Sequence, residues 1–140
     1  MLNKLGSRHQ GTTWKVSYYI SGDSTYSFIK DIYFVNKNVG WAVGSYQIDN
    51  TVEGFIVKTT DGGSAWENIT PENFKEVKLV FFLSPEIGWV FSGYTLYKTS
   101  DGGISWNPIS SYFGAVEAIT FINTQIGFVC VSSPDGIKKT

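Results

Sequence analysis

A nine-residue segment occurs twice in this chain, and its spacing constrains the fold more than any other feature. Residues 58–66 read KTTDGGSAW, and residues 98–106 read KTSDGGISW, 40 positions later. A second pattern repeats with it. A Phe in an apolar run is followed six positions later by Gly, at 34 and 40, 82 and 88, and 121 and 127. Such a period indicates a repeat architecture, in which each unit buries its apolar face against the next.

Each unit of about 40 residues contains four short strand-like runs. In the middle unit they cover residues 78–83, 87–92, 95–99 and 105–109, and the first is apolar almost throughout, as strands buried on both faces are. The composition agrees, with 16% aromatic residues and no convincing window of helical period. We therefore predict an all-β fold of β-propeller blades, each a four-stranded antiparallel meander.

The repeats correspond to about three blades' worth of strands in a single domain, residues 1–140. We predict a lone fourth strand at about 12–20, blades at about 29–69 and 77–110, and a partial blade at about 117–140. Propellers have roughly four to eight blades, so three do not close a ring. One interpretation is an incomplete propeller, cut from a longer one. The other is self-association, in which the fourth strand of one copy completes the last blade of another.

The repeated T-x-D-G-G-x-x-W sequence is predicted to form the turn between the third and fourth strands of a blade. Its Asp accepts hydrogen bonds from nearby backbone N–H groups, its second Gly allows positive φ, and its Trp covers the turn. We predict a structural role for Thr59, Asp61, Gly63, Trp66, Thr99, Asp101, Gly103 and Trp106. A degraded copy places His9 at the Asp position. One carboxylate per turn is too few for calcium, so we predict no metal site.

These residues resemble the Asp-box, or BNR-repeat, family, whose pattern is S/T-x-D-x-G-x-x-W. The VGWAVG strand at residues 39–44, ahead of KTTDGG, resembles the photosystem II assembly and stability factor type of propeller. That resemblance implies six or seven blades, export from the cytoplasm, and a non-enzymatic binding or assembly scaffold that recognises a protein partner. It implies no cofactor, and the residues themselves indicate no photosystem partner.

Asp-box turns also occur in sialidases and other glycoside hydrolases, which gives an enzymatic alternative. Sialidases resemble one another in gripping the substrate carboxylate with three arginines, whereas this chain has one, Arg8. Lysine does not replace the planar guanidinium. We therefore expect no catalytic residues, unless further blades complete a site. A carbohydrate-binding lectin propeller is a third interpretation, which the unequal loop lengths of the blades disfavour.

Other classes are disfavoured by charge and hydropathy. The net charge is −1 and the lysines are scattered, so the sequence does not predict nucleic-acid binding. Residues 1–8 lack the apolar stretch of a secretory signal, and no apolar run approaches the ~18 residues that span a bilayer. The single cysteine, Cys130, lies in an apolar run and is predicted to be a small buried thiol rather than a nucleophile.

Loop lengths indicate where a partner would bind. From the Gly of the second strand to the Lys of the third, the spacing is 18, 10 and 12 residues in successive units, so the first unit carries a longer connection. Loops on a rigid scaffold commonly carry function. We predict a recognition surface on this end of the blades that includes Tyr46, Asp49, Glu53, Phe74, Tyr112 and Phe113.

Overall fold

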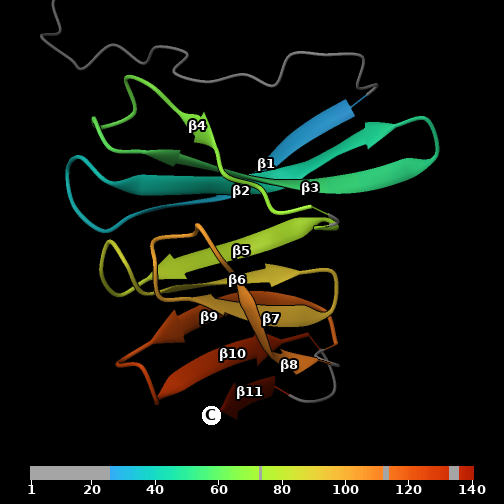
Figure 1. Ribbon diagram of the computed structural model, residues 1–140. Coiled ribbons are helices and arrows are strands. Elements are labelled where there is room, and N and C mark those ends of the chain that lie inside the picture. Colours follow the sequence, from blue (N-terminus) through green and yellow to red (C-terminus); the bar gives the residue numbers. More distant parts are fainter. Residues whose placement is uncertain (1–25, 73, 112–113, 133–135) are drawn as a thin grey trace, which may run out of the picture.

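The computed structural model describes residues 26–72, 74–111, 114–132 and 136–140 as three stacked antiparallel sheets (Figure 1). The first sheet contains β1 (Tyr26–Phe34), β2 (Gly40–Ile48), β3 (Thr51–Thr59) and β4 (Glu67–Asn68). The second contains β5 (Val77–Phe82), β6 (Gly88–Ser92), β7 (Thr95–Thr99) and β8 (Asn107–Ser111). The third contains β9 (Val116–Phe121), β10 (Gly127–Val131) and β11 (Gly136–Lys139). The predicted strand at 12–20 lies outside the described residues.

Each sheet is a meander, because strands that follow one another in the sequence pair as neighbours. β5 packs against β1 and β2 on one side and against β9 on the other. The first strand of each sheet therefore lies beside the first strand of the next, as Figure 1 shows. The predicted all-β fold of antiparallel meanders is confirmed, with four strands in the first two sheets and three in the described part of the third.

The first three predicted strands of the middle unit agree with the structure to within one residue at each end, and the fourth differs by two. That strand begins at Asn107 rather than at 105, because the two preceding residues complete the turn. The backbone N–H of Ser105 donates to Asp101 Oδ1 at 2.9 Å, and Trp106 Nε1 donates to the Gly103 carbonyl at 3.1 Å. The backbone N–H of Ser105 and the indole N–H of Trp106 therefore both donate within the turn.

The longer connection of the first unit is a strand extension, not a loop. β2 and β3 pair without interruption from Gly40 and Thr59 to Ile48 and Thr51, so only Asp49 and Asn50 form the turn. The prediction of a long surface loop here is wrong in this respect. Residues 45–48 and 51–53 alternate in polarity on either side of Asp49 and Asn50, as paired strands joined by a two-residue turn do, but the comparison of unit lengths does not distinguish such strands from a loop.

The two boundaries between sheets hold the core, and each repeats the same aromatic arrangement. Phe82 lies on Gly88 of its own sheet and stacks on Trp41 of the first sheet, with ring centroids 3.4 Å apart. Phe121 likewise lies on Gly127 and stacks on Trp89, with centroids 3.7 Å apart. A Cβ on Gly88 would lie 2.4 Å from the Phe82 ring. The repeated Phe and Gly of the sequence therefore form one packing unit, which a side chain on the Gly would displace.

Candidate functional site

The first T-x-D-G-G turn is held by a closed set of hydrogen bonds. Thr59 Oγ1 donates to Asp61 Oδ1 at 2.9 Å and accepts from the N–H of Gly63 at 2.9 Å. The N–H of Ala65 donates to the same carboxylate at 2.9 Å. These bonds lower the pKa of Asp61, and the bond from Ala65 has the largest effect.

The second turn repeats this geometry and adds one hydroxyl. Thr99 Oγ1 donates to Asp101 Oδ1 at 2.7 Å and accepts from the N–H of Gly103 at 2.9 Å. Ser105 Oγ donates to Asp101 Oδ2 at 2.5 Å, and this bond is the largest cause of the strongly lowered pKa of Asp101. Gly63 and Gly103 have φ of 87° and 97°, a region that a side chain would disfavour.

The turns also connect strands within and between sheets. The N–H of Gly62 donates to the Asn38 carbonyl in the β1–β2 turn at 2.8 Å. The carbonyl of Gly102 in the second sheet accepts from Trp41 Nε1 at 3.2 Å and from Lys58 Nζ at 3.1 Å, both from the first sheet. The first turn is therefore bonded within its own sheet, whereas the second turn joins the second sheet to the first.

The predicted recognition residues occupy different environments. Tyr46 is half-buried and pairs in register with Glu53, whose carboxylate contacts Lys75 Nζ at 3.1 Å. Asp49 is exposed at the hairpin turn with φ of 51°. Phe74 is a correction to the predicted surface, because its side chain is only 8% exposed.

Phe74 packs against Tyr97, with ring centroids 4.7 Å apart, because the connection between the first two sheets folds inward. Its carbonyl accepts a hydrogen bond from the N–H of Gly54 at 2.8 Å, which holds this connection against the base of the hairpin. Tyr112 and Phe113 lie outside the described residues.

A shallow groove of about 180 Å³ runs between β1 and the hairpin, and sequence analysis did not identify it. Its side chains combine exposed aromatic groups with both signs of charge. They belong to Tyr26, Phe28, Lys30, Ser45, Tyr46, Gln47, Val52 and Glu76. Lys30 Nζ lies 3.5 Å from a Glu76 carboxylate oxygen and 5.2 Å from the centre of the Phe28 ring. Tyr26 and Phe28 line it from β1, which pairs here with the extended part of β2.

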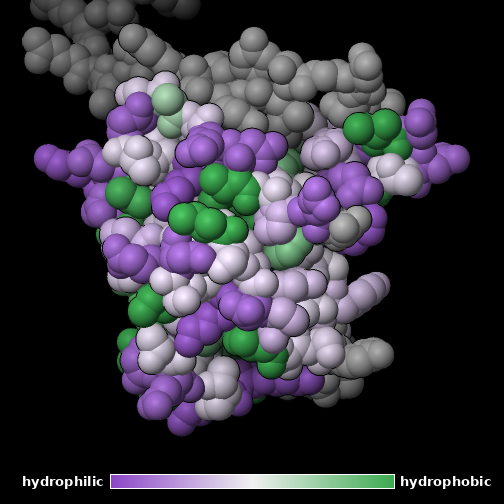
Figure 2. All heavy atoms as spheres, in the orientation of Figure 1, coloured by the Kyte–Doolittle hydropathy of each residue, from purple (hydrophilic) through white to green (hydrophobic). Residues whose placement is uncertain are grey.

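A second groove, of about 390 Å³, lies between the second and third sheets beside β11. It is lined by Leu96, Ile109, Ser110, Val129, Lys138, Lys139 and Thr140. Among the described residues, β11 pairs with β10 alone, so its other side is a sheet edge. Figure 2 shows hydrophobic side chains in several small groups on the visible face, separated by hydrophilic ones.

The described ranges contain no group of three or more His, Cys, Asp or Glu side chains able to hold a metal ion. Cys130 is half-buried, whereas the sequence predicted a buried thiol. Within those same ranges, no helix has the length and apolar character needed to cross a membrane.

Comparison with known proteins supports the fold through a solved structure. No protein-family model matches the chain, and no curated protein matches it. The solved structure of YCF48 bound to D1 peptide is similar, with 25% sequence identity and a TM-score of 0.66. The match covers 86% of this chain and 40% of that one, so this chain spans less than half the length of its match. The similarity confirms the β-propeller fold class, with about three blades, so each sheet is hereafter called a blade.

Proposed function

We propose that this chain is a non-enzymatic propeller scaffold that recognises a protein partner through an exposed peptide segment. The observation that carries the proposal is the likeness to YCF48 bound to D1 peptide, over 86% of this chain. The resemblance of its turns to Asp-box repeats fits the same role, because these turns hold the blades rigid and leave the opposite ends of the strands free for binding.

The groove beside the β2–β3 hairpin has the chemistry that peptide recognition needs. Tyr26, Phe28 and Val52 are 60%, 55% and 45% exposed, so they offer apolar contacts without unfolding any part of the blade. Lys30 and Glu76 provide a cation and an anion at the same place. Aromatic anchors beside a few polar groups are typical of sites that bind peptides with specificity.

The enzymatic alternative has no comparable support. A sialidase-like site requires three guanidinium groups on one carboxylate, and the sequence contains Arg8 alone. A propeller fold by itself carries no activity, because one fold hosts many functions. We therefore place the function in binding and propose no catalytic residue.

The proposal can be tested with a displayed library of random peptides selected against the immobilised protein. Enriched peptides are synthesised and titrated calorimetrically against wild type, Tyr26→Ala, Val52→Asp and the control Ile104→Ala. Ile104 is 81% exposed in the turn between β7 and β8, away from the groove, so it serves as a matched surface control. We expect about tenfold or greater loss of affinity for the two groove variants, equal to ~1.4 kcal/mol, and none for the control.

Two results would contradict the proposal. One is the absence of any peptide that binds the folded protein in a saturable manner. The other is a set of peptides whose affinity is unchanged by both groove substitutions, which would place recognition elsewhere on the molecule. Far-UV circular dichroism of each variant confirms that a lost affinity is not lost folding.

A further inference from the structure

The boundary between neighbouring blades follows one rule at both places where the structure shows it. An aromatic ring of strand two stacks on the Phe of strand one in the next blade, as in Trp41 on Phe82 and Trp89 on Phe121. A lysine paired in register with each tryptophan lies over its ring. Lys58 Nζ is 5.4 Å from the centre of the Trp41 ring, and Lys98 Nζ is 5.3 Å from the centre of the Trp89 ring.

Both lysines also reach the following blade. Lys58 Nζ donates to the Gly102 carbonyl at 3.1 Å, and Lys98 Nζ donates to the Thr124 carbonyl at 3.4 Å. Each boundary therefore combines a stacked aromatic pair with a lysine that is bonded to a turn of the neighbour. The acceptor lies in the β7–β8 turn at the first boundary and in the β9–β10 turn at the second.

The side of the first blade that faces away from the second has strand-one residues at the same positions as those that form one side of a boundary. In the second blade, Val77, Val80 and Phe82 face the preceding blade and are 0%, 4% and 1% exposed. The residues at the same positions in the first blade are Ile29, Ile32 and Phe34, and these are 52%, 54% and 39% exposed. Phe34 covers Gly40, as Phe82 covers Gly88, so its ring is already placed for stacking.

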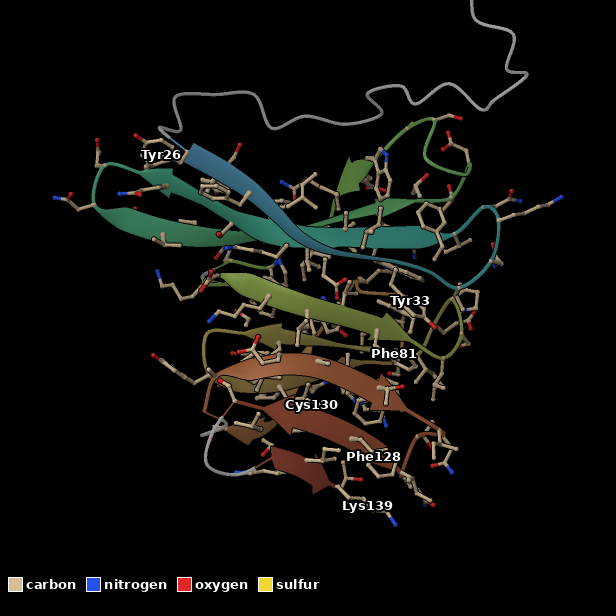
Figure 3. All side chains as sticks on the ribbon, turned by 180° about the vertical axis from the view of Figure 1, so that it is seen from behind. Tyr26, Tyr33, Phe81, Phe128, Cys130 and Lys139 are labelled. Carbon is tan, nitrogen blue, oxygen red and sulfur yellow. The ribbon has the colours of Figure 1, made fainter. Side chains whose placement is uncertain are left out.

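The outer side of the third blade carries the other half. Trp89, Phe91 and Leu96 of the second blade are nearly fully buried against the third blade. Their counterparts are Phe128, Cys130 and Ile137; the first two are half-buried and Ile137 is 71% exposed. Phe128 pairs in register with Lys139, which repeats the pairing of aromatic ring and lysine. Figure 3 shows Phe128 and Lys139 on the last two strands, at the end of the stack remote from β1.

We infer that two copies of this chain dock head to tail, with Phe128 of one copy stacked on Phe34 of the other. Lys139 lies over the Phe128 ring and donates to a turn carbonyl of the second copy, as Lys58 and Lys98 do within the chain. The occupant is a second copy because the two outer faces carry the two halves of an interface that already exists twice. Two head-to-tail contacts close a ring of about six blades, within the range of four to eight that propellers adopt.

This inference is independent of the proposed function, because the peptide groove and the outer faces use different exposed side chains. Sedimentation velocity over a concentration series of the full chain tests it directly. We expect a discrete dimer for wild type and for the surface control Ile104→Asp. Phe34→Asp and Phe128→Asp should each weaken dimerisation by at least about 30-fold, the effect of a hot-spot residue.

Mixing the two variants distinguishes head-to-tail docking from misfolding. In a mixed dimer of Phe34→Asp and Phe128→Asp, one of the two interfaces keeps both phenylalanines. The mixture should therefore form dimers under conditions in which neither variant dimerises alone. In a Cys130→Ser background, Phe34→Cys and Phe128→Cys in separate copies should be joined by a short bismaleimide, whereas Ile104→Cys should not. A wild-type monomer at every concentration, or cross-linking that is equal for all three cysteines, would overturn the inference.

Discussion

The rings of Trp41 and Phe82 stack in parallel across the first blade boundary, with planes 3° apart and centroids separated by 3.4 Å. Both side chains are almost fully buried. The indole N–H of the same tryptophan donates to the Gly102 carbonyl at 3.2 Å. Trp41 therefore packs against the first strand of the next blade and also holds a turn of that blade through a hydrogen bond.

Substitution of Trp41 should separate these two contributions. Trp41→Ala removes the stacked ring and leaves a cavity, so we expect the free energy of unfolding to fall by about 3–5 kcal/mol. Trp41→Phe keeps an aromatic ring but removes the indole donor to the Gly102 carbonyl, which still accepts from Lys58 Nζ, and we expect a loss of about 0.5–1.5 kcal/mol. Urea unfolding followed by far-UV circular dichroism measures both. The control Tyr94→Ala alters a side chain that is 72% exposed and should change stability by less than about 0.5 kcal/mol.

Gly88 should tolerate no side chain while Phe82 is present. The Cβ of Gly88→Ala would lie 2.4 Å from the Phe82 ring, so the ring must move and its stack on Trp41 is disturbed. We expect a loss of about 1–3 kcal/mol, the usual cost of overpacking. Thermal unfolding of Gly88→Ala, Phe82→Leu and the double variant gives the coupling free energy between positions 82 and 88. If the two single effects simply add, the contact is not the cause.

The same Phe and Gly explain how far the sequence predicts the fold. Their spacing of six residues, repeated three times, places a ring over a glycine in every unit, and this fixes strand order and blade number. The hairpin was not predicted from the spacing alone. Residues 45–48 and 51–53 alternate in polarity around Asp49 and Asn50, but a comparison of unit lengths counts the extra residues without distinguishing a loop from longer strands.

The candidate site was less predictable for a related reason. Phe74 was predicted to lie at the surface because it belongs to a loop, yet it is buried by packing on Tyr97 of another strand. The exposed groove residues Tyr26 and Phe28 were overlooked because an aromatic residue in a strand is ordinarily buried. Both errors come from contacts between residues that are distant in the sequence.

Asp101 should stabilise the fold in a manner that depends on pH. Hydrogen bonds, that of Ser105 Oγ first, lower its pKa in the folded state below the ordinary 3.8. The charged form is thus favoured by folding, and the stabilisation is fully present above the unfolded pKa and is lost as pH falls toward the lowered folded value. We expect Asp101→Asn to be less stable than wild type at pH 7.

The difference between wild type and Asp101→Asn should shrink only at pH below about 4, where the carboxylate begins to be protonated in the unfolded chain. Urea midpoints at pH 7, 5, 4 and 3 measure this difference. Ser105→Ala is the companion variant, because it removes the hydrogen bond that lowers the pKa of Asp101 most and leaves the carboxylate. A difference that stays constant across the whole range would show that the charge of Asp101 does not contribute.

Lys58 should contribute to the first boundary through its charge rather than through its alkyl chain. Its ammonium lies 5.4 Å from the Trp41 ring centre and 3.1 Å from the Gly102 carbonyl oxygen. Lys58→Met keeps a chain of similar length without the charge, and we expect a loss of about 0.5–2 kcal/mol. Lys37→Met, also a lysine but without such contacts among the described interactions, is the control. Equal stabilities of the two variants would contradict this role.

The backbone conformation of Asp49, in the turn between β2 and β3, leads to the last prediction. Its φ of 51° lies in the left-handed region, which Asp tolerates and a β-branched residue does not. Asp49→Val should therefore reduce the free energy of unfolding by about 1–2 kcal/mol, whereas Asp49→Gly should change it by less than about 1 kcal/mol, because glycine adopts this conformation without steric cost. Guanidinium unfolding measures both.

The same pair of variants tests whether the hairpin supports the groove. The Asp49 carbonyl accepts a hydrogen bond from Gln47 Nε2 at 3.0 Å, and Gln47 and Val52 line the groove on either side of the turn. If the turn conformation holds these side chains in place, Asp49→Val should also weaken peptide binding several-fold under conditions where the protein stays folded, and Asp49→Gly should not. Loss of stability without loss of affinity would show that the groove forms independently of the turn, since β1 and the base of the hairpin would then suffice to position Tyr26 and Val52.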